Sequence, residues 1–284
     1  FASDSSFRIQ GLFTGLNGDL RADLNRRFPK TDEAKKFLEH CISATFTVED
    51  ISKKPAKKSP ASPFTTSTLQ QEAARKLRYS VSRTMLLAQR LYESGKITYM
   101  RTDSVNLSDF ALEAAEQTIK NDFGKQYFER RQFKTKSKAA QEAHEAIRPT
   151  DFNKETVDGP KDEQALYELI WKRAIASQMS DAEIERTTAK IKITGNKDVL
   201  TAKGEVIKFD GFLKVYLEDT DDENSENGDD AILPPLKVGQ KLDMKEIVAT
   251  ERYTRASARF TEASLVKKLE ELGIGRPSTY APTI

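Results

Sequence analysis

The spacing of hydrophobic residues changes twice along this chain of 284 residues. Apolar and polar residues alternate in residues 7–13 and 44–51, which is the period of a half-buried strand. From Thr68 to residue 179 the apolar residues recur at helical spacing, and after Ala182 the alternation returns. The sequence therefore predicts an α+β multidomain fold in which a discontinuous β-rich domain contains an inserted helical domain.

The segment 52–63 separates the first strands from the helical region. Its four lysines and three prolines are typical of a solvated connector, although direct contact of these lysines with a nucleic acid remains an alternative. The expected division is a first β-rich part with its linker at 1–63, a helical domain at 64–182, a second β-rich part at 183–250 and a truncated helical segment at 251–284.

Two short helices are expected at the start of the helical region. Leu69, Ala73 and Leu77 would line one face of the first helix, and Ser82 can cap the second. The pair, joined by residues 79–82, resembles a helix-turn-helix, which is a DNA-binding arrangement. Packing of two core helices would give the same pattern, so both interpretations stay open.

Further elements follow along the chain. A short strand at 97–99 is expected to precede a helix that Ser108 caps, with Leu112, Ala115 and Ile119 on its inner face. Trp171 is expected in the core of a helix at 163–179. Strand-like patterns then occupy 187–193, 199–206, 212–217 and 241–248.

The last segment is predicted to be helical again. Thr261 can cap a helix whose buried side would carry Leu265, Leu269 and Leu272. Pro277 stands where a new helix would begin. Ser278 and Thr279 would then offer hydroxyls and unpaired backbone N–H groups that suit a phosphate, with Arg276 beside them.

Composition excludes several classes of protein. No run of about 18 or more apolar residues is present, so the sequence predicts no membrane span. Cys41, the single cysteine, can form neither an internal disulfide nor a zinc site by itself. No signal peptide is apparent, and the chain begins at Phe1 without an initiator Met. We therefore expect a cytoplasmic protein and a piece of a longer polypeptide.

Charge is distributed unevenly along the chain. The net charge is only +2, but residues 52–150 contain 19 Lys and Arg against 10 Asp and Glu. Residues 218–230 contain eight acidic residues and no basic one. A locally basic segment of this kind is the electrostatic footprint expected for a phosphodiester substrate.

The most informative stretch is 97–108, in which Tyr99 stands two positions before Arg101. In an extended segment both side chains point to the same side, so both can reach one phosphate. A tyrosine hydroxyl, with a pKa of about 10, is a weak nucleophile until a cation such as Arg101 stabilises the phenolate. Taken alone, the pair is also explained by a surface Tyr beside a solvated Arg.

The longer string Ile-Thr-Tyr-Met-Arg-Thr-Asp-Ser at 97–104 resembles the active-site signature of bacterial type IA DNA topoisomerases. Gln-Glu-Ala-His-Glu-Ala-Ile-Arg-Pro-Thr at 141–150 is similar to that family's histidine motif. The segment 259–280 is similar to its DNA-holding segment, and 63–71 to the entry into its tyrosine-bearing domain. The resemblance implies that the β-rich domain is an arch and that the helical domain carries the nucleophile.

The resemblance also implies a reaction and site residues. Tyr99 would be the nucleophile that cleaves single-stranded DNA through a 5′-phosphotyrosine, assisted by Arg101 and His144. Arg148, Arg276, Ser278 and Thr279 would bind DNA, although Arg148 could equally be an ion-pair partner of nearby glutamates. The intact enzyme, a monomer, would relax negatively supercoiled DNA by strand passage and religation without ATP, and no nucleotide-binding glycine loop is present.

Mg²⁺ is the cofactor that the resemblance implies, and the family binds it on an N-terminal domain that this chain lacks. Asp219-Thr-Asp221 is the one Asp-x-Asp in the chain, and its acidic low-complexity setting predicts a solvated loop rather than a metal site. We therefore expect no metal site in this chain, and we expect the chain by itself to be inactive.

Two other classes remain to be distinguished. A tyrosine recombinase also uses a Tyr nucleophile, but its Arg-His-Arg set precedes a C-terminal Tyr, whereas His144 and Arg276 follow Tyr99 here. A non-enzymatic DNA-binding module built on the helix-turn-helix is the other alternative. A covalent protein–DNA adduct would separate an enzyme from a binding module.

Overall fold

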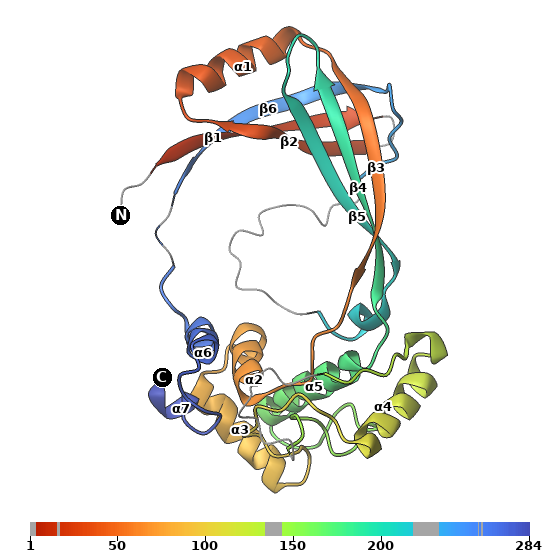
Figure 1. Cartoon of the computed structure of the whole chain (residues 1–284), viewed down its shortest axis with the longest axis vertical. Coiled ribbons are helices and arrows are strands. Elements are labelled where there is room, and N and C mark those ends of the chain that lie inside the picture. The colour runs from red at the N-terminus through yellow and green to blue at the C-terminus, as the bar shows by residue number, and fades with distance from the viewer. Residues whose placement is uncertain (1–3, 16–17, 134–143, 218–232, 255, 257) are drawn as a thin grey trace. The chain divides into compact units, whose positions relative to one another are not determined.

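The computed structural model describes residues 4–15, 18–133, 144–217, 233–254, 256 and 258–284 of the chain. It is a mixed α+β structure whose chain separates into two compact units. The β unit consists of residues 1–56, 183–208 and 222–258, and the helical unit of 57–182, 209–221 and 259–284. Both units are built from segments that are far apart in the sequence (Figure 1).

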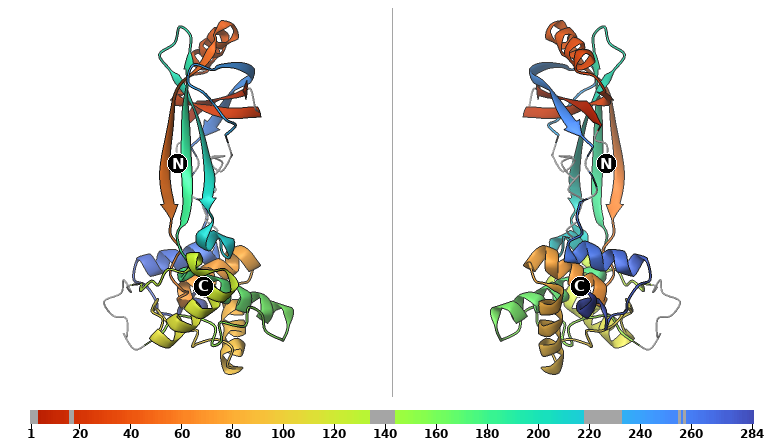
Figure 2. Two further views of the ribbon diagram at one scale, coloured as in Figure 1. Left: turned by 90° about the vertical axis from the view of Figure 1, so that its right-hand side faces the viewer. Right: turned by 90° about the vertical axis from the view of Figure 1, so that its left-hand side faces the viewer.

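The β unit is a closed barrel with the strand order β1-β2-β5-β4-β3-β6. The neighbours β1–β2, β1–β6, β2–β5 and β3–β6 are antiparallel. Figure 2 shows β3, β4 and β5 running side by side. The elements are β1 (Ser5–Gly15), β2 (Gly18–Phe28), α1 (Thr31–Ser43), β3 (Phe46–Lys58), β4 (Ala182–Ile193), β5 (Val199–Phe209) and β6 (Lys241–Tyr253).

One hydrophobic cluster fills the β unit. Ile9 and Phe13 alternate with more exposed residues on β1, and Ala34, Phe37 and Cys41 recur at helical spacing on α1. The helix α1 therefore covers β1, β2 and β6 with its apolar face. Burial raises the pKa of the Cys41 thiol to about 11, so this cysteine belongs to the core.

Two expectations for this unit were incomplete or wrong. The polar stretch after the first strand forms β2 and α1, which the sequence did not resolve. The predicted connector at 52–63 is wrong for residues 52–58, because β3 continues through them as far as Lys58. Lys53 lies 3.8 Å from Glu185 of β4, so a neighbouring strand supplies the countercharge that makes a lysine-rich strand possible.

The helical unit contains the remaining elements. These are α2 (Thr66–Glu72), the π-helical turn η1 (Ala73–Leu77), α3 (Val81–Glu93), α4 (Asp109–Asp122), the 3₁₀ turn η2 (Lys125–Tyr127), α5 (Lys161–Ser177), the 3₁₀ turn η3 (Gly211–Lys214), α6 (Glu262–Glu271) and α7 (Tyr280–Thr283). α6 packs against α2, and α7 against α3.

The core of this unit matches the helical pattern of the sequence. Leu69 and Ala73 are buried, as are Leu112, Ala115 and Ile119 on α4. Ser108 caps α4, as predicted, since its hydroxyl accepts from the N–H of Ala111. The core placement of Trp171 is also confirmed, because its Nε1–H donates to the buried carbonyl of Phe152 at 2.8 Å.

Several local predictions for this unit were wrong. The cap of α3 is Ser80 rather than Ser82, because the Ser80 hydroxyl accepts from the N–H of Arg83 at 3.2 Å. Residues 97–99 are not a regular strand, since only an isolated bridge joins Ile97 to Pro149.

Two further predictions, the strand at 212–217 and the buried side of α6, differ from the structure because of packing against other elements. The strand pattern at 212–217 gives the turn η3, in which Phe212 is buried in the helical core and its N–H donates to Ser180. The buried residues of α6 are Ala263 and Val266, whereas the predicted Leu265 and Leu269 are only half-buried and Leu272 is exposed. Small residues allow α6 to approach α2 closely. None of the helices in the described ranges is both long and apolar enough to span a membrane.

Candidate active site

Tyr99 and Arg101 are exposed, whereas the other residues of the segment 97–108 are buried or half-buried. The Tyr99 side chain is 44% exposed, whereas Met100 and Thr102 on either side of Arg101 are each 4% exposed. This alternation agrees with the expectation that Tyr99 and Arg101 share one side of an extended segment. Both side chains can therefore reach a ligand from solvent.

The surroundings of these two side chains differ. The ring of Tyr99 packs edge-on against Tyr92 of α3, with 5.2 Å between the centroids and 68° between the planes. Within the described part of the chain, the guanidinium of Arg101 makes no hydrogen bond or ion pair. Its five donors are thus available to an anion such as phosphate.

Two threonines hold the backbone of this segment. The hydroxyl of Thr98 donates to the carbonyl of Ala146 at 2.7 Å and accepts from the N–H of Arg148 at 3.0 Å. The buried Thr66 on α2 contacts the backbone of Met100 and Thr102. The sequence did not single out either threonine, although Thr66 belongs to the 63–71 motif.

The histidine motif lies directly beside the tyrosine segment. Thr98 N–H donates to the carbonyl of Arg148 at 2.9 Å, and Ile97 bridges Pro149. On the other side, Ala146 N–H donates to the carbonyl of Asn106 at 2.8 Å. The sequence did not indicate that the tyrosine segment and the histidine motif lie together. In the fold, backbone hydrogen bonds hold them side by side.

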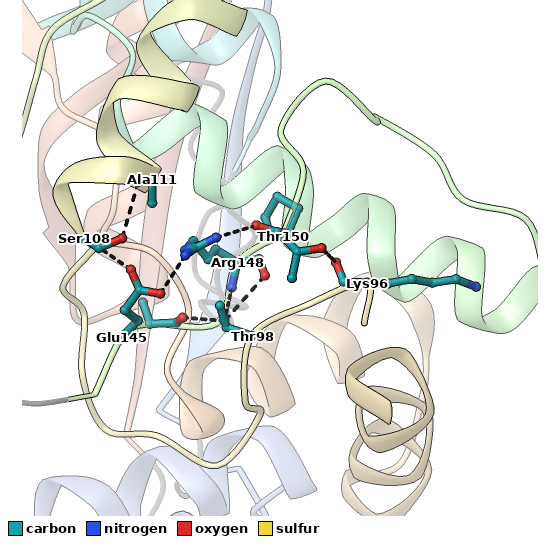
Figure 3. A network of polar contacts seen from close by, with 9 residues as sticks. Lys96, Thr98, Ser108, Ala111, Glu145, Arg148 and Thr150 are labelled. Atoms are coloured by element: carbon teal, nitrogen blue, oxygen red, sulfur yellow. Dashed lines mark hydrogen bonds and ion pairs between the residues drawn. The ribbon is translucent and has the colours of Figure 1, made fainter. Parts of the chain in front are cut away.

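Glu145 and Arg148 form an ion pair within this motif (Figure 3). Arg148 Nη2 donates to Glu145 Oε2 at 2.7 Å, and Arg148 Nη1 donates to the carbonyl of Pro149 at 3.0 Å. The Ser108 N–H donates to Glu145 Oε1 at 2.7 Å, which joins the motif to the start of α4. Burial opposes ionisation of Glu145, but Ser108 and Arg148 outweigh it and hold the pKa of this carboxyl below its usual range.

Arg148 is 8% exposed, and both of its terminal nitrogens are used inside the chain. Its Nε is buried and has no partner among the described residues. This arrangement favours the ion-pair interpretation that the sequence left open. Contact of Arg148 with DNA stays a prediction. His144 is exposed and directly precedes Glu145, so it lies at the solvent edge of the same network.

The turn 276–279 differs from the expected phosphate cradle. Arg276, Ser278 and Thr279 are exposed, but the N–H groups of Thr279 and Tyr280 both donate to the carbonyl of Arg276. The Arg276 N–H in turn donates to Thr279 Oγ1 at 2.8 Å. The expectation of unpaired N–H groups at Ser278 and Thr279 is therefore wrong for Thr279, because the turn satisfies its N–H internally.

Charged contacts place this C-terminal segment in the same unit as the tyrosine. Ser67 donates to Glu270 at 2.5 Å, and the N–H of Val81 donates to Glu262 at 2.7 Å. Burial raises the pKa of Tyr280, and the carboxylates of Glu270 and Asp103 raise it further.

No metal site is found in the described ranges. They contain no group of three or more His, Cys, Asp or Glu side chains that could hold a metal ion. Asp219 and Asp221 lie outside the described residues, as do residues 134–143 at the start of the histidine motif.

Comparison with known proteins gives consistent matches. A family model described as DNA topoisomerase matches residues 1–284. DNA topoisomerase 1 of Zymomonas mobilis is 51% identical over 247 residues, which cover 85% of this chain and 20% of that protein. DNA topoisomerase 1 of Rickettsia bellii is 48% identical over 265 residues, which cover 88% of this chain and 33% of that protein.

A solved structure, full-length topoisomerase I from Thermotoga maritima, has a TM-score of 0.82 and 36% identity. The match covers 100% of this chain and 46% of that one. The chain therefore spans well under two thirds of these relatives, from 20% of the Zymomonas protein to 46% of the Thermotoga chain.

Proposed function

Because this chain belongs to the bacterial DNA topoisomerase I family, we propose that it supplies the strand-cleaving tyrosine of a type IA enzyme. The observation that carries this proposal is the pair of exposed side chains, Tyr99 and Arg101, on a backbone held by Thr66 and Thr98. A reactive pair needs access to substrate together with a fixed geometry, and this segment combines the two.

In the proposed reaction the phenolic oxygen of Tyr99 attacks the phosphorus of a DNA phosphodiester. A bond forms between this oxygen and phosphorus while the phenol loses its proton, the bond to the 3′ oxygen breaks, and the 3′ oxygen takes up a proton, so that the numbers of bonds and protons are unchanged overall. The product is a 5′-phosphotyrosine and a free 3′ hydroxyl, and attack by that hydroxyl reverses the step. No nucleotide is hydrolysed, because the ester retains the energy of the broken bond.

Arg101 is proposed to bind the phosphate and stabilise its developing negative charge, since its guanidinium is exposed and has no partner among the described residues. His144 is proposed to donate a hydrogen bond to the same phosphate from the edge of the Glu145 network. Arg276, Ser278 and Thr279 would contact the DNA strand beside it, and Arg148 would support the site through Glu145.

The other features of the whole enzyme are proposals of the same kind. Relaxation of negatively supercoiled DNA would follow strand passage through the gap, in a cytoplasmic, monomeric protein. Mg²⁺ would be held by another part of the polypeptide, as the resemblance to the family implies. The β unit would correspond to the arch domain expected at 1–63 and 183–250, and the helical unit to the helical domain expected at 64–182 together with the DNA-contact segment expected at 251–284.

The test is to trap the covalent adduct with the intact enzyme. Tyr99→Phe should abolish the adduct with labelled single-stranded DNA while DNA affinity stays within about twofold, because only the hydroxyl is lost. Tyr92→Phe is the matched control, since Tyr92 is also exposed and packs on the same ring, and it should keep the adduct.

If Tyr99→Phe still formed the adduct, Tyr99 would not be the nucleophile. Strong binding of DNA by the wild-type enzyme without any adduct would instead favour a binding module, in which α2, η1 and α3 act as a helix-turn-helix.

A further inference from the structure

Thr66 is a fully buried residue with an unusual set of hydrogen bonds. Its side chain is 0% exposed, and it lies at the start of α2, far in sequence from Tyr99. The hydroxyl donates to the carbonyl of Met100 at 2.8 Å, with the carbonyl of Thr102 at 3.1 Å. The same oxygen accepts from the N–H of Thr102 at 2.8 Å, and the Thr66 N–H donates to the Thr102 carbonyl at 2.9 Å.

These bonds fall on both sides of Arg101. Met100 C=O belongs to the peptide unit before Arg101, and Thr102 N–H to the unit after it. The direction in which the Arg101 side chain leaves the backbone is set by these two peptide units. Because the guanidinium has no partner of its own among the described residues, these backbone bonds are the contacts that fix the point and direction from which the side chain starts.

Thr66 is itself well fixed. It is the first residue of α2, whose N-terminus is closed by a capping box between Thr65 and Thr68. A β-branched side chain on a helix also has few rotamers available. The hydroxyl of Thr66 therefore acts as a fixed point of the helical core, against which the tyrosine segment is held.

We propose that Thr66 is a positioning residue for strand cleavage, which sets the direction of Arg101 and, through the peptide of Met100, the position of Tyr99. This inference rests on the proposed function. A displacement of about 1 Å at a reacting group can lower a rate by roughly 100-fold, so loss of the Thr66 hydroxyl should affect the chemical step. DNA binding should change little, because the buried hydroxyl is inaccessible to DNA.

The experiment compares three variants of the intact enzyme. Thr66→Val removes the hydroxyl and keeps the shape, and Thr66→Ser keeps the hydroxyl. Thr84→Val is the matched control. Thr84 is also 0% exposed in the helical unit, but its hydroxyl donates to the Ser80 carbonyl of its own helix and does not touch the tyrosine segment.

Two quantities are measured for each variant. One is the single-turnover rate of adduct formation at saturating single-stranded DNA, together with the dissociation constant. The other is hydrogen exchange of the peptide that covers residues 98–104, which reports the backbone anchor independently of any activity.

Thr66→Val should lower the cleavage rate by roughly 10- to 100-fold with an unchanged dissociation constant, and it should speed exchange at 98–104. Thr66→Ser should recover the rate to within about threefold of wild type, and Thr84→Val should leave both quantities near wild type. If Thr66→Val does not fold, Thr66→Cys, whose thiol is a weak donor, takes its place and should give an intermediate rate.

A rate in Thr66→Val equal to that of Thr84→Val would overturn the proposal, and so would a folded Thr66→Ser with no recovery. Failure of the proposed function looks different, because in that case wild type itself gives no Tyr99-dependent adduct. Even if wild type gave no adduct, faster hydrogen exchange at 98–104 in Thr66→Val would show that the Thr66 hydroxyl holds the backbone of this segment.

Discussion

At the scale of single residues, the proposed role of Arg101 cannot be read from its contacts within the described part of the chain. It lies exposed between two buried neighbours, Met100 and Thr102, so the backbone is fixed while the guanidinium stays available. Its planar fork can bind two phosphate oxygens at once, which a lysine cannot do. The residue is therefore suited to recognise a phosphate that is absent from the free protein.

Arg101→Lys should slow cleavage more than it weakens DNA binding. The charge is kept, but the two-point contact with the phosphate is lost, so we expect a decrease of about 10-fold or more in the single-turnover rate. The dissociation constant for single-stranded DNA serves as the internal control. An unchanged cleavage rate would mean that Arg101 is a bystander.

Glu145 gives a prediction on pH. Ser108 and Arg148 hold the pKa of its carboxyl below the usual 4.5, so the unfolded chain binds protons more readily there than the folded one. The resulting stabilisation is fully present above pH 4.5 and is lost as the pH falls through the lower pKa of the folded state.

Glu145→Gln should therefore lower the free energy of unfolding at pH 7, and the difference from wild type should shrink as the pH falls below about 4.5. Urea unfolding at several pH values measures this. Glu155→Gln, a change at an exposed carboxylate outside the network, is the control. A difference that grows toward acid pH would contradict the assigned direction.

At the scale of elements, helix α3 shows that a cap is decided by geometry. Two serines stand near its start, and only Ser80 accepts a hydrogen bond from the first turn, from Arg83. Ser82 lies inside the helix and is exposed. The two serines thus form a matched pair for measuring the contribution of the cap.

Ser80→Ala should reduce the free energy of unfolding by about 0.5–2 kcal/mol, which is the usual contribution of an N-cap. Ser82→Ala should change it by less than about 0.5 kcal/mol, as expected for an exposed helical position. Chemical denaturation of both variants is the measurement. The reverse order of the two effects would place the cap at Ser82 after all.

At the scale of the whole molecule, the candidate site residues come from distant parts of the sequence. Tyr99, the histidine motif and the turn 276–279 all belong to the helical unit, which is assembled from residues 57–182, 209–221 and 259–284. No metal-ligand cluster is present in the described ranges. The proposed partner of this half-site is the metal-bearing part of the full enzyme.

This chain by itself should bind single-stranded DNA weakly, with an affinity that falls as salt rises, and should neither cleave nor relax DNA. The exposed side chains of Arg101 and Arg276 can contact phosphates, whereas the acidic 218–230 segment repels them. Groups that act as a unit lose most of their rate when one half is missing. Incubation with labelled single-stranded DNA and Mg²⁺, then denaturation, tests this, and a Tyr99-dependent band would refute it.

By itself, the sequence determined the class of fold, the buried face of α4, the core position of Trp171 and the family. These features depend on local periodicity or on contiguous motifs, and both can be read from neighbouring residues in the sequence. The same reasoning identified Tyr99 and Arg101 as a candidate pair, because residues two positions apart in an extended segment point to the same side.

Only the tertiary structure decided the rest. It placed 145–149 beside 97–98, formed the 3₁₀ turn η3 where a strand was predicted at 212–217 and extended β3 through a lysine-rich stretch. Each of these outcomes depends on a partner that is distant in sequence, and local propensity cannot contain information about that partner. Thr66 was missed for the same reason, since its role comes from a backbone that folding brings to it.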